Sequence, residues 1–172
     1  MKTYIYCFSI FAAIGTGHIY GDTLTNNWGP VTNNIQMSIC IESNKYEIKP
    51  NESVNLIIRF RNLSTNMSFA AHNSLQAQTD PETGVYCTVI SPSGSDISPN
   101  TEKTYAGGSG AAGLVGPNKT YEFAFRLSDL CKFNKHGTYK ITAKKVVRLQ
   151  DGRKPIEVVS NTLRLSVVRV WP

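Results

Sequence analysis

The chain has 172 residues, of which 41% are hydrophobic and 17% are charged. This composition excludes a disordered polar chain and suits one globular domain of about 150 residues, which is large enough to bury about two thirds of its unfolded surface. The 18 Lys and Arg residues exceed the 12 Asp and Glu residues and give a net charge of +6, which favours an anionic partner.

Residues 1–21 are predicted to be a secretory signal peptide. Lys2 follows the amino terminus, residues 4–14 form an uncharged apolar run, and the small residues Gly17 and Gly21 come after it. The run is shorter than the roughly 20 residues of a transmembrane helix, and no second apolar run appears. We expect cleavage after Gly21, or else after Gly17, and export of a mature chain without a transmembrane segment to the periplasm or the extracellular space. The alternative is a buried N-terminal strand or helix.

Three cysteines, Cys40, Cys87 and Cys131, remain after the predicted cleavage, because Cys7 leaves with the signal peptide. An exported chain can pair two of them, and all three pairings stay open. Their long spacings contain no C-x-x-C pattern, so neither a redox motif nor a zinc knuckle is predicted.

The first predicted strands follow a polar segment, residues 22–34. From residue 35 onward, apolar and polar residues alternate with the period of a β-strand. Within the first strand, Cys40 falls on the outward phase, which is unusual for a core thiol. The strands predicted in this half of the chain lie within residues 35–42, 53–64, 67–72 and 85–92.

The later strands are predicted within residues 120–127, 137–149 and 155–170. The last two are joined around Asp151 and Gly152, a dipeptide that favours a hairpin because it tolerates positive φ. The alternation predicts that the core contains Leu56, Ile58, Phe60, Phe123, Phe125, Tyr139, Ile141, Leu163 and Leu165.

The pattern predicts an all-β fold, an antiparallel immunoglobulin-like β-sandwich that forms a single domain over residues 35–170. It contains about seven to nine strands, with turn signals about every 8 to 12 residues. Tyr139 follows Gly137 at the start of a late strand. It resembles the tyrosine corner of such sandwiches, in which the phenol bonds to loop backbone, and an ordinary core tyrosine is the alternative.

The densest glycine segment is AGGSGAAG, residues 106–113. A phosphate-binding loop or a nucleophile elbow needs a helix after the glycines, whereas this segment leads into a predicted strand. Around Ser109 the position that should complete G-x-S-x-G is Ala111. The segment is therefore predicted to be a mobile loop between two strands.

No catalytic residue, cofactor or metal site is predicted. The mature chain has only two histidines, His72 and His136, and no spacing brings them together with carboxylates. The loop carboxylates do not form the alternating pattern of a calcium loop; they are Asp80, Glu82, Asp96 and Asp129. The N-x-S/T sequons, which matter only in a eukaryotic secretory pathway, begin at Asn51, Asn62, Asn66 and Asn118.

The positive charge is concentrated late in the chain, where only Asp151 and Glu157 oppose it. A protein or an anionic envelope glycan is the expected partner, and nucleic acid is a poor one for an exported protein. A run of charge alone specifies no ligand, so these residues are expected to form a solvated face, and a binding patch is the alternative. The basic residues are Lys132, Lys135, Lys140, Lys144, Lys145, Arg148, Arg153, Lys154, Arg164 and Arg169.

The segments YEIKPNESVNLIIRFRNLSTNMSF, LVGPNKTYEFAFRLSDL and VVSNTLRLSV resemble strands of exported bacterial immunoglobulin-like domains. The layout is also similar to that of the intracellular proteinase inhibitor family, which is cytoplasmic. These resemblances imply a fold that hosts many functions.

Two predicted loops also resemble those of chagasin-like inhibitors of cysteine proteases. The first contains Asp80, Pro81, Glu82, Thr83 and Gly84, and the second contains Gly107, Gly108, Ser109 and Gly110. The third motif of that family, R-P-W, is missing. The sequence thus predicts an exported, non-enzymatic binding or cell-envelope interaction module. The alternative is a protease inhibitor that presents these two loops.

Overall fold

The computed structural model describes residues 27–72, 84–98, 112–129, 131–149 and 154–169, and these contain ten strands and one short 3₁₀ turn. None of the helical structure in the described ranges is long and apolar enough to cross a membrane. The elements are β1 (Ile35–Ile41), β2 (Glu47–Ile48), β3 (Asn55–Asn62), β4 (Phe69–His72), β5 (Val85–Ile90), β6 (Ala112–Val115), β7 (Thr120–Arg126), η1 (Leu127–Asp129), β8 (Gly137–Val147), β9 (Ile156–Val159) and β10 (Leu163–Val167).

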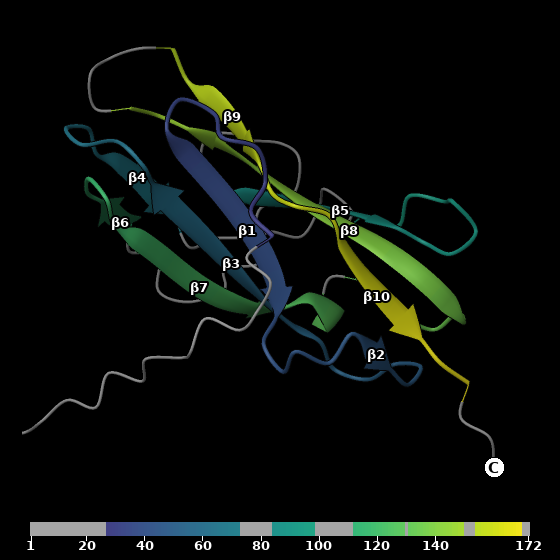
Figure 1. Ribbon diagram of the computed structural model, residues 1–172. Coiled ribbons are helices and arrows are strands. Elements are labelled where there is room, and N and C mark those ends of the chain that lie inside the picture. Colours follow the sequence, from purple (N-terminus) through teal and green to yellow (C-terminus); the bar gives the residue numbers. More distant parts are fainter. Residues whose placement is uncertain (1–26, 73–83, 99–111, 130, 150–153, 170–172) are drawn as a thin grey trace, which may run out of the picture.

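Two sheets form the sandwich (Figure 1). Sheet A has the order β1-β3-β7, and all of its pairs are antiparallel. Sheet B has the order β2-β10-β8-β5, with β9 paired to the far end of β8. β2 joins β10 in parallel, and β4 and β6 form a separate antiparallel pair. The predicted all-β immunoglobulin-like sandwich is confirmed.

The core lies between the sheets because each strand alternates as the sequence predicts. Seven of the nine predicted core residues are at most 5% exposed. Phe123 and Phe125 are exceptions, since they pack against the core but stay partly exposed. Both lie on β7, which among the described strands pairs only with β3 and so lies at the margin of sheet A. They face the core as predicted, but they are only partly buried.

Tyr139 forms the predicted tyrosine corner. Its side chain is 1% exposed, and its hydroxyl donates to the Lys135 carbonyl at 3.1 Å and accepts from the Lys135 amide at 3.0 Å. The ring meets Phe133 edge-on at 5.1 Å. The corner therefore fixes the loop that precedes β8, as in other sandwiches of this type.

The strand predicted over residues 155–170 is two strands, β9 and β10. Ser160 interrupts it, because its hydroxyl accepts the Ala143 amide at 2.9 Å and donates to the Asn161 carbonyl at 2.7 Å. Asn161 then accepts the Ile39 amide at 2.8 Å and donates to the Ile39 carbonyl at 3.1 Å. The interruption between β9 and β10 therefore links β1, at the edge of sheet A, to β8 in sheet B through hydrogen bonds.

The segment before β1 packs between β1 and the end of β9, at the edge where Asn161 joins the two sheets. The Gly29 amide donates to the Met37 carbonyl at 2.8 Å. A Cβ atom at Gly29 would lie 2.1 Å from the Val159 carbonyl oxygen, so only glycine fits between the two sheets here. The next residue back, Trp28, stacks under the guanidinium of Arg61 at 4.3 Å, on the outer face of sheet A.

Candidate functional site

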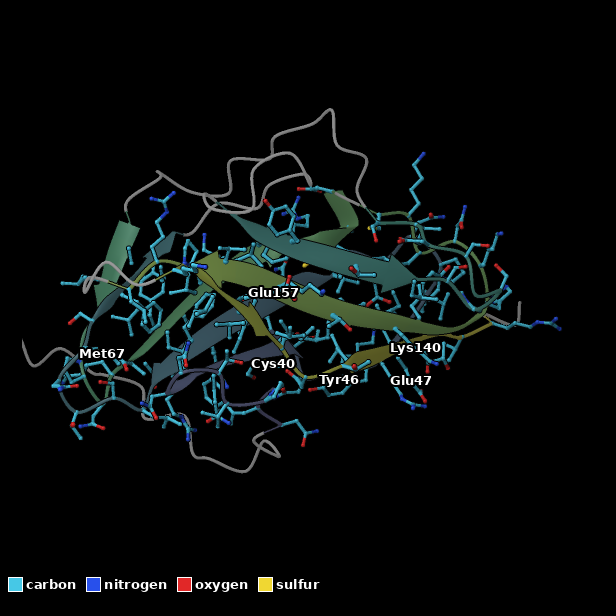
Figure 2. All side chains as sticks on the ribbon, turned by 90° about the horizontal axis from the view of Figure 1, so that it is seen from above. Cys40, Tyr46, Glu47, Met67, Lys140 and Glu157 are labelled. Carbon is cyan, nitrogen blue, oxygen red and sulfur yellow. The ribbon has the colours of Figure 1, made fainter. Side chains whose placement is uncertain are left out.

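The outer face of sheet B carries three of the basic residues that the sequence places late in the chain, Lys140, Lys144 and Arg164. Side chains on β5, β8 and β10 alternate between the core and this face. We call the outward set the basic face; it comprises Tyr86, Thr88, Ile90, Thr138, Lys140, Thr142, Lys144, Arg164 and Ser166. Figure 2 shows Met67 near one end of the sandwich and Lys140 well away from it, in the other half of the molecule.

Lys140 and Arg164 are direct cross-strand partners on the neighbouring strands β8 and β10. Both are exposed, and Ile90 lies opposite Lys140 on its other side. Directly opposed side chains in an antiparallel pair have Cβ atoms about 4.5–5.5 Å apart, and like charges placed so are destabilising. Within the described part of the chain, no ion pair joins either residue to a carboxylate.

Two carboxylates border this region. Glu157 on β9 accepts from Lys144 at 3.1 Å and neutralises it. Glu47 on β2 lies in register with Ser166, two residues along β10 from Arg164. The uncompensated charge is therefore concentrated on Lys140 and Arg164.

Lys145 does not belong to the basic face, which corrects the predicted cluster. It is 1% exposed and pairs with Val85 and Val158 on the core phase of β8. Lys144 and Lys145 are adjacent, so a strand must point one of them inward.

A hollow of about 230 Å³ lies beside the start of β8, at the Lys140 end of the basic face. Lys132 and Lys135 line it together with Ser91, Ile97, Asn134 and Tyr139. The Ser91 hydroxyl lies 3.0 Å from that of Ser93. Because Tyr139 holds the Lys135 backbone, this end adds exposed cations on a fixed loop.

The three described thiols are poor nucleophiles, and none forms a disulfide in the structure. Burial raises the pKa of Cys87, and the nearby Cys131 raises it further. Burial also raises the pKa of Cys131, to about 12. Cys40 is half-buried on the outer face of sheet A, as its outward phase predicts, and burial raises its pKa more than Arg59 lowers it. A reactive cysteine needs the opposite shift.

Within the described ranges no group of three His, Cys, Asp or Glu residues is arranged to hold a metal ion. His136 is exposed in the turn before β8, and nothing is described of the His72 side chain. Asp96 bonds to the hydroxyl and the amide of Ser98, and these bonds lower its pKa. Asp129 lies in η1, while Asp80 and Glu82 fall outside the described residues.

The two predicted partner-binding loops lie almost wholly outside the described residues. Only Gly84 is described, and it is buried directly before β5. His72 and Ala112 flank the undescribed stretches and are cross-strand partners in β4 and β6. The chain therefore enters one stretch and leaves the other at neighbouring points. The mobility predicted for the glycine-rich segment also falls outside the described residues.

The structure separates the four sequons into two groups. Asn62 is 1% exposed, and its side-chain amide donates to the carbonyls of Met67, Val115 and Gly116 at 2.7–3.0 Å. It therefore anchors two turns and is closed to modification. The others are exposed in turns, at Asn51, Asn66 and Asn118.

No family model and no curated protein matches this chain. Several solved structures match it, including the following two. Northeast Structural Genomics Consortium target SoR45 is 12% identical with a TM-score of 0.52, over 83% of this chain and 96% of that one. The CARDB domain of the PF1109 protein from Pyrococcus furiosus, in complex with di-metal ions, is 14% identical with a TM-score of 0.41, over 80% of this chain and 97% of that one. The first likeness supports the fold over the part of the chain that it covers.

Proposed function

We propose that this chain is an exported, non-catalytic binding module whose basic face binds an acidic polysaccharide of the cell envelope. The observation that carries the proposal is the direct opposition of Lys140 and Arg164 on neighbouring strands. A sulfate or carboxylate group between the two cations would convert a repulsive pair into two attractive contacts.

The geometry of the face suits a polymer. Residues two apart on a strand are about 7 Å apart, so Lys140 and Lys144 are separated by roughly 13 Å along β8. A chain with repeated anionic groups can contact Lys140 and Arg164 together and then reach Lys144, which it would share with Glu157. Ile90 and the ring of Tyr86 add apolar surface of the kind that the faces of sugar rings cover.

The absence of catalysis is part of the proposal. Each thiol has a raised pKa, so the thiolate that a cysteine nucleophile requires is disfavoured. The basic face has hydroxyls and cations but no carboxylate or imidazole in its centre, and general acid–base catalysis depends on such groups.

The test is binding to dextran sulfate and polygalacturonate, with uncharged dextran as the control polymer. We expect binding to a charged polymer that weakens as salt increases. Lys140→Glu and Arg164→Glu should each weaken it at least about tenfold, which corresponds to about 1.4 kcal/mol.

Lys119→Glu is the matched control, because Lys119 is exposed in the turn at the opposite end of the sandwich. It should leave the affinity unchanged. The proposal is wrong if neither charged polymer binds, or if the control weakens binding as much as the two basic-face variants do.

A second candidate function is inhibition of papain-like proteases. It is favoured by the pairing of His72 with Ala112, because the chain enters the first undescribed stretch and leaves the second at neighbouring points. Titration of papain with the protein tests it. Undiminished protease activity at micromolar protein would remove this candidate.

A further inference from the structure

The exposed edge of β7 is regular and self-complementary. β7 runs for seven residues, Thr120–Arg126, without proline, and among the described strands only β3 pairs with it. Figure 1 shows it at the margin of sheet A, on the far side of β3 from β1. Such an edge offers unpaired backbone groups to another strand.

The side chains along this edge are only partly covered. Tyr121, Phe123 and Phe125 face the core but remain partly exposed, while Glu122, Ala124 and Arg126 are exposed on the outer face. Phe123 stacks on Phe60 at 6.4 Å and lies 6.1 Å from Tyr121 between ring centroids, and its side chain remains partly exposed. An edge of this kind can bury further apolar area by adding a strand.

We propose that two copies of this chain pair through β7 in antiparallel, two-fold symmetric fashion, and so form one continuous sheet from their two A sheets. With the two-fold axis at Ala124, Glu122 of one copy faces Arg126 of the other, and the arrangement occurs twice. The same register places Phe123 opposite Phe125 twice on the inner face. Cross-strand pairs of both kinds are stabilising in antiparallel sheets.

The register follows from the sequence of the strand. Paired residues must share a face, so the two-fold axis must coincide with a residue rather than fall between two. An axis at Phe123 would set Glu122 opposite Ala124 and leave both charges without partners. Only the axis at Ala124 satisfies both the charges and the aromatic rings.

The two charged groups are available for this contact. Glu122 accepts from Arg59 at 2.8 Å, but its side chain is 54% exposed and a carboxylate accepts from several donors. Arg126 is exposed and has no ion pair within the described ranges. An isolated strand edge buries little area, so we expect a dimer that dissociates in the micromolar range or above.

The test is sedimentation equilibrium on the purified chain and its charge variants. The wild type should dimerise reversibly with concentration. Arg126→Glu alone places Glu opposite Glu twice, and Glu122→Arg alone places Arg opposite Arg twice, so each variant should dimerise at least about tenfold more weakly. An equimolar mixture of the two variants restores both pairs and should form the heterodimer.

Arg169→Glu makes the same charge change as Arg126→Glu at an exposed position after β10, and it should dimerise like the wild type. Recovery in the mixture also shows that both variants are folded. The proposal fails if the wild type stays monomeric up to about 1 mM, or if either variant alone dimerises as the wild type does. Polymer binding by sheet B is a separate measurement and does not affect this outcome.

Discussion

On the outer face of sheet A, Arg59 donates to Glu122 at 2.8 Å and Arg61 lies 4.3 Å from the centre of the Trp28 ring. On the outer face of sheet B, Lys140 and Arg164 oppose each other with no carboxylate partner in the described ranges. Arg59 and Arg61 on sheet A have partners within the chain, whereas Lys140 and Arg164 on sheet B lie directly opposite each other without one among the described residues. The difference indicates which face is suited to an external anion.

Both faces are supported by one core, so removing its central aromatic ring should lower the free energy of unfolding more than the other substitutions. Phe60 is fully buried and contacts Phe69 and Phe123. Phe60→Ala should lower the free energy of unfolding by about 3–5 kcal/mol. Phe123→Ala should lower it by less, because that ring is partly exposed. Urea denaturation checks both, and equal losses would contradict the assignment of β7 to the margin.

Alkaline pH should destabilise the core beneath the two faces. Burial raises the pKa of Cys87 and of Cys131, so each thiol stabilises the fold fully below the unfolded pKa of about 8.5. This contribution is lost as pH rises toward the folded pKa, by up to about 1.4 kcal/mol per pH unit for each thiol.

Denaturation at a series of pH values above neutrality measures this slope. The control is the variant Cys87→Ala with Cys131→Ala, which should be less stable but should show a flatter decline with pH. A wild-type slope equal to that of the double variant would contradict the burial of the thiols.

The tyrosine corner supports the loop that carries Lys135. Its removal should lower the free energy of unfolding by an intermediate amount. Tyr139→Phe removes the bonds to the Lys135 backbone and should lower the free energy of unfolding by about 1–2 kcal/mol. Amide exchange around Lys135 should accelerate more than exchange within β3. Uniform acceleration would mean that the corner does not act locally.

The ion pair between Arg59 and Glu122 on sheet A should contribute least to the free energy of unfolding. Glu122→Gln removes the partner of Arg59 at a partly exposed site and should lower the free energy of unfolding by at most about 1 kcal/mol. High salt should reduce the difference between the variant and the wild type. A difference that persists unchanged in high salt would indicate a contact other than the ion pair.

The sequence predicts most of the fold because the period of two is strong in every long strand. It offers Tyr139 as a tyrosine corner or an ordinary core residue, and the hydrogen bonds to Lys135 decide between them. The phase of β8 also points Lys145 inward, although charge alone suggests a surface position. The break at Ser160 is not visible in the alternation, because Ser160 and Asn161 act through bonds to Ala143 and to Ile39, which is distant in sequence.

The candidate site is harder to predict, since it depends on register. Lys140 and Arg164 are both outward in phase, but only strand pairing makes them opposite neighbours. Likewise, the partial exposure of Phe123 follows from the place of β7 in its sheet rather than from the local pattern.

The most direct test of the central claim is the stability of Lys140→Thr at low salt without any polymer. If Lys140 and Arg164 repel each other across the strands, the variant should be more stable than the wild type by about 0.2–1 kcal/mol, and high salt should remove the gain. The same variant should bind dextran sulfate more weakly. A variant that is less stable than the wild type at low salt would contradict the account, because the basic face would then have its charges compensated within the chain.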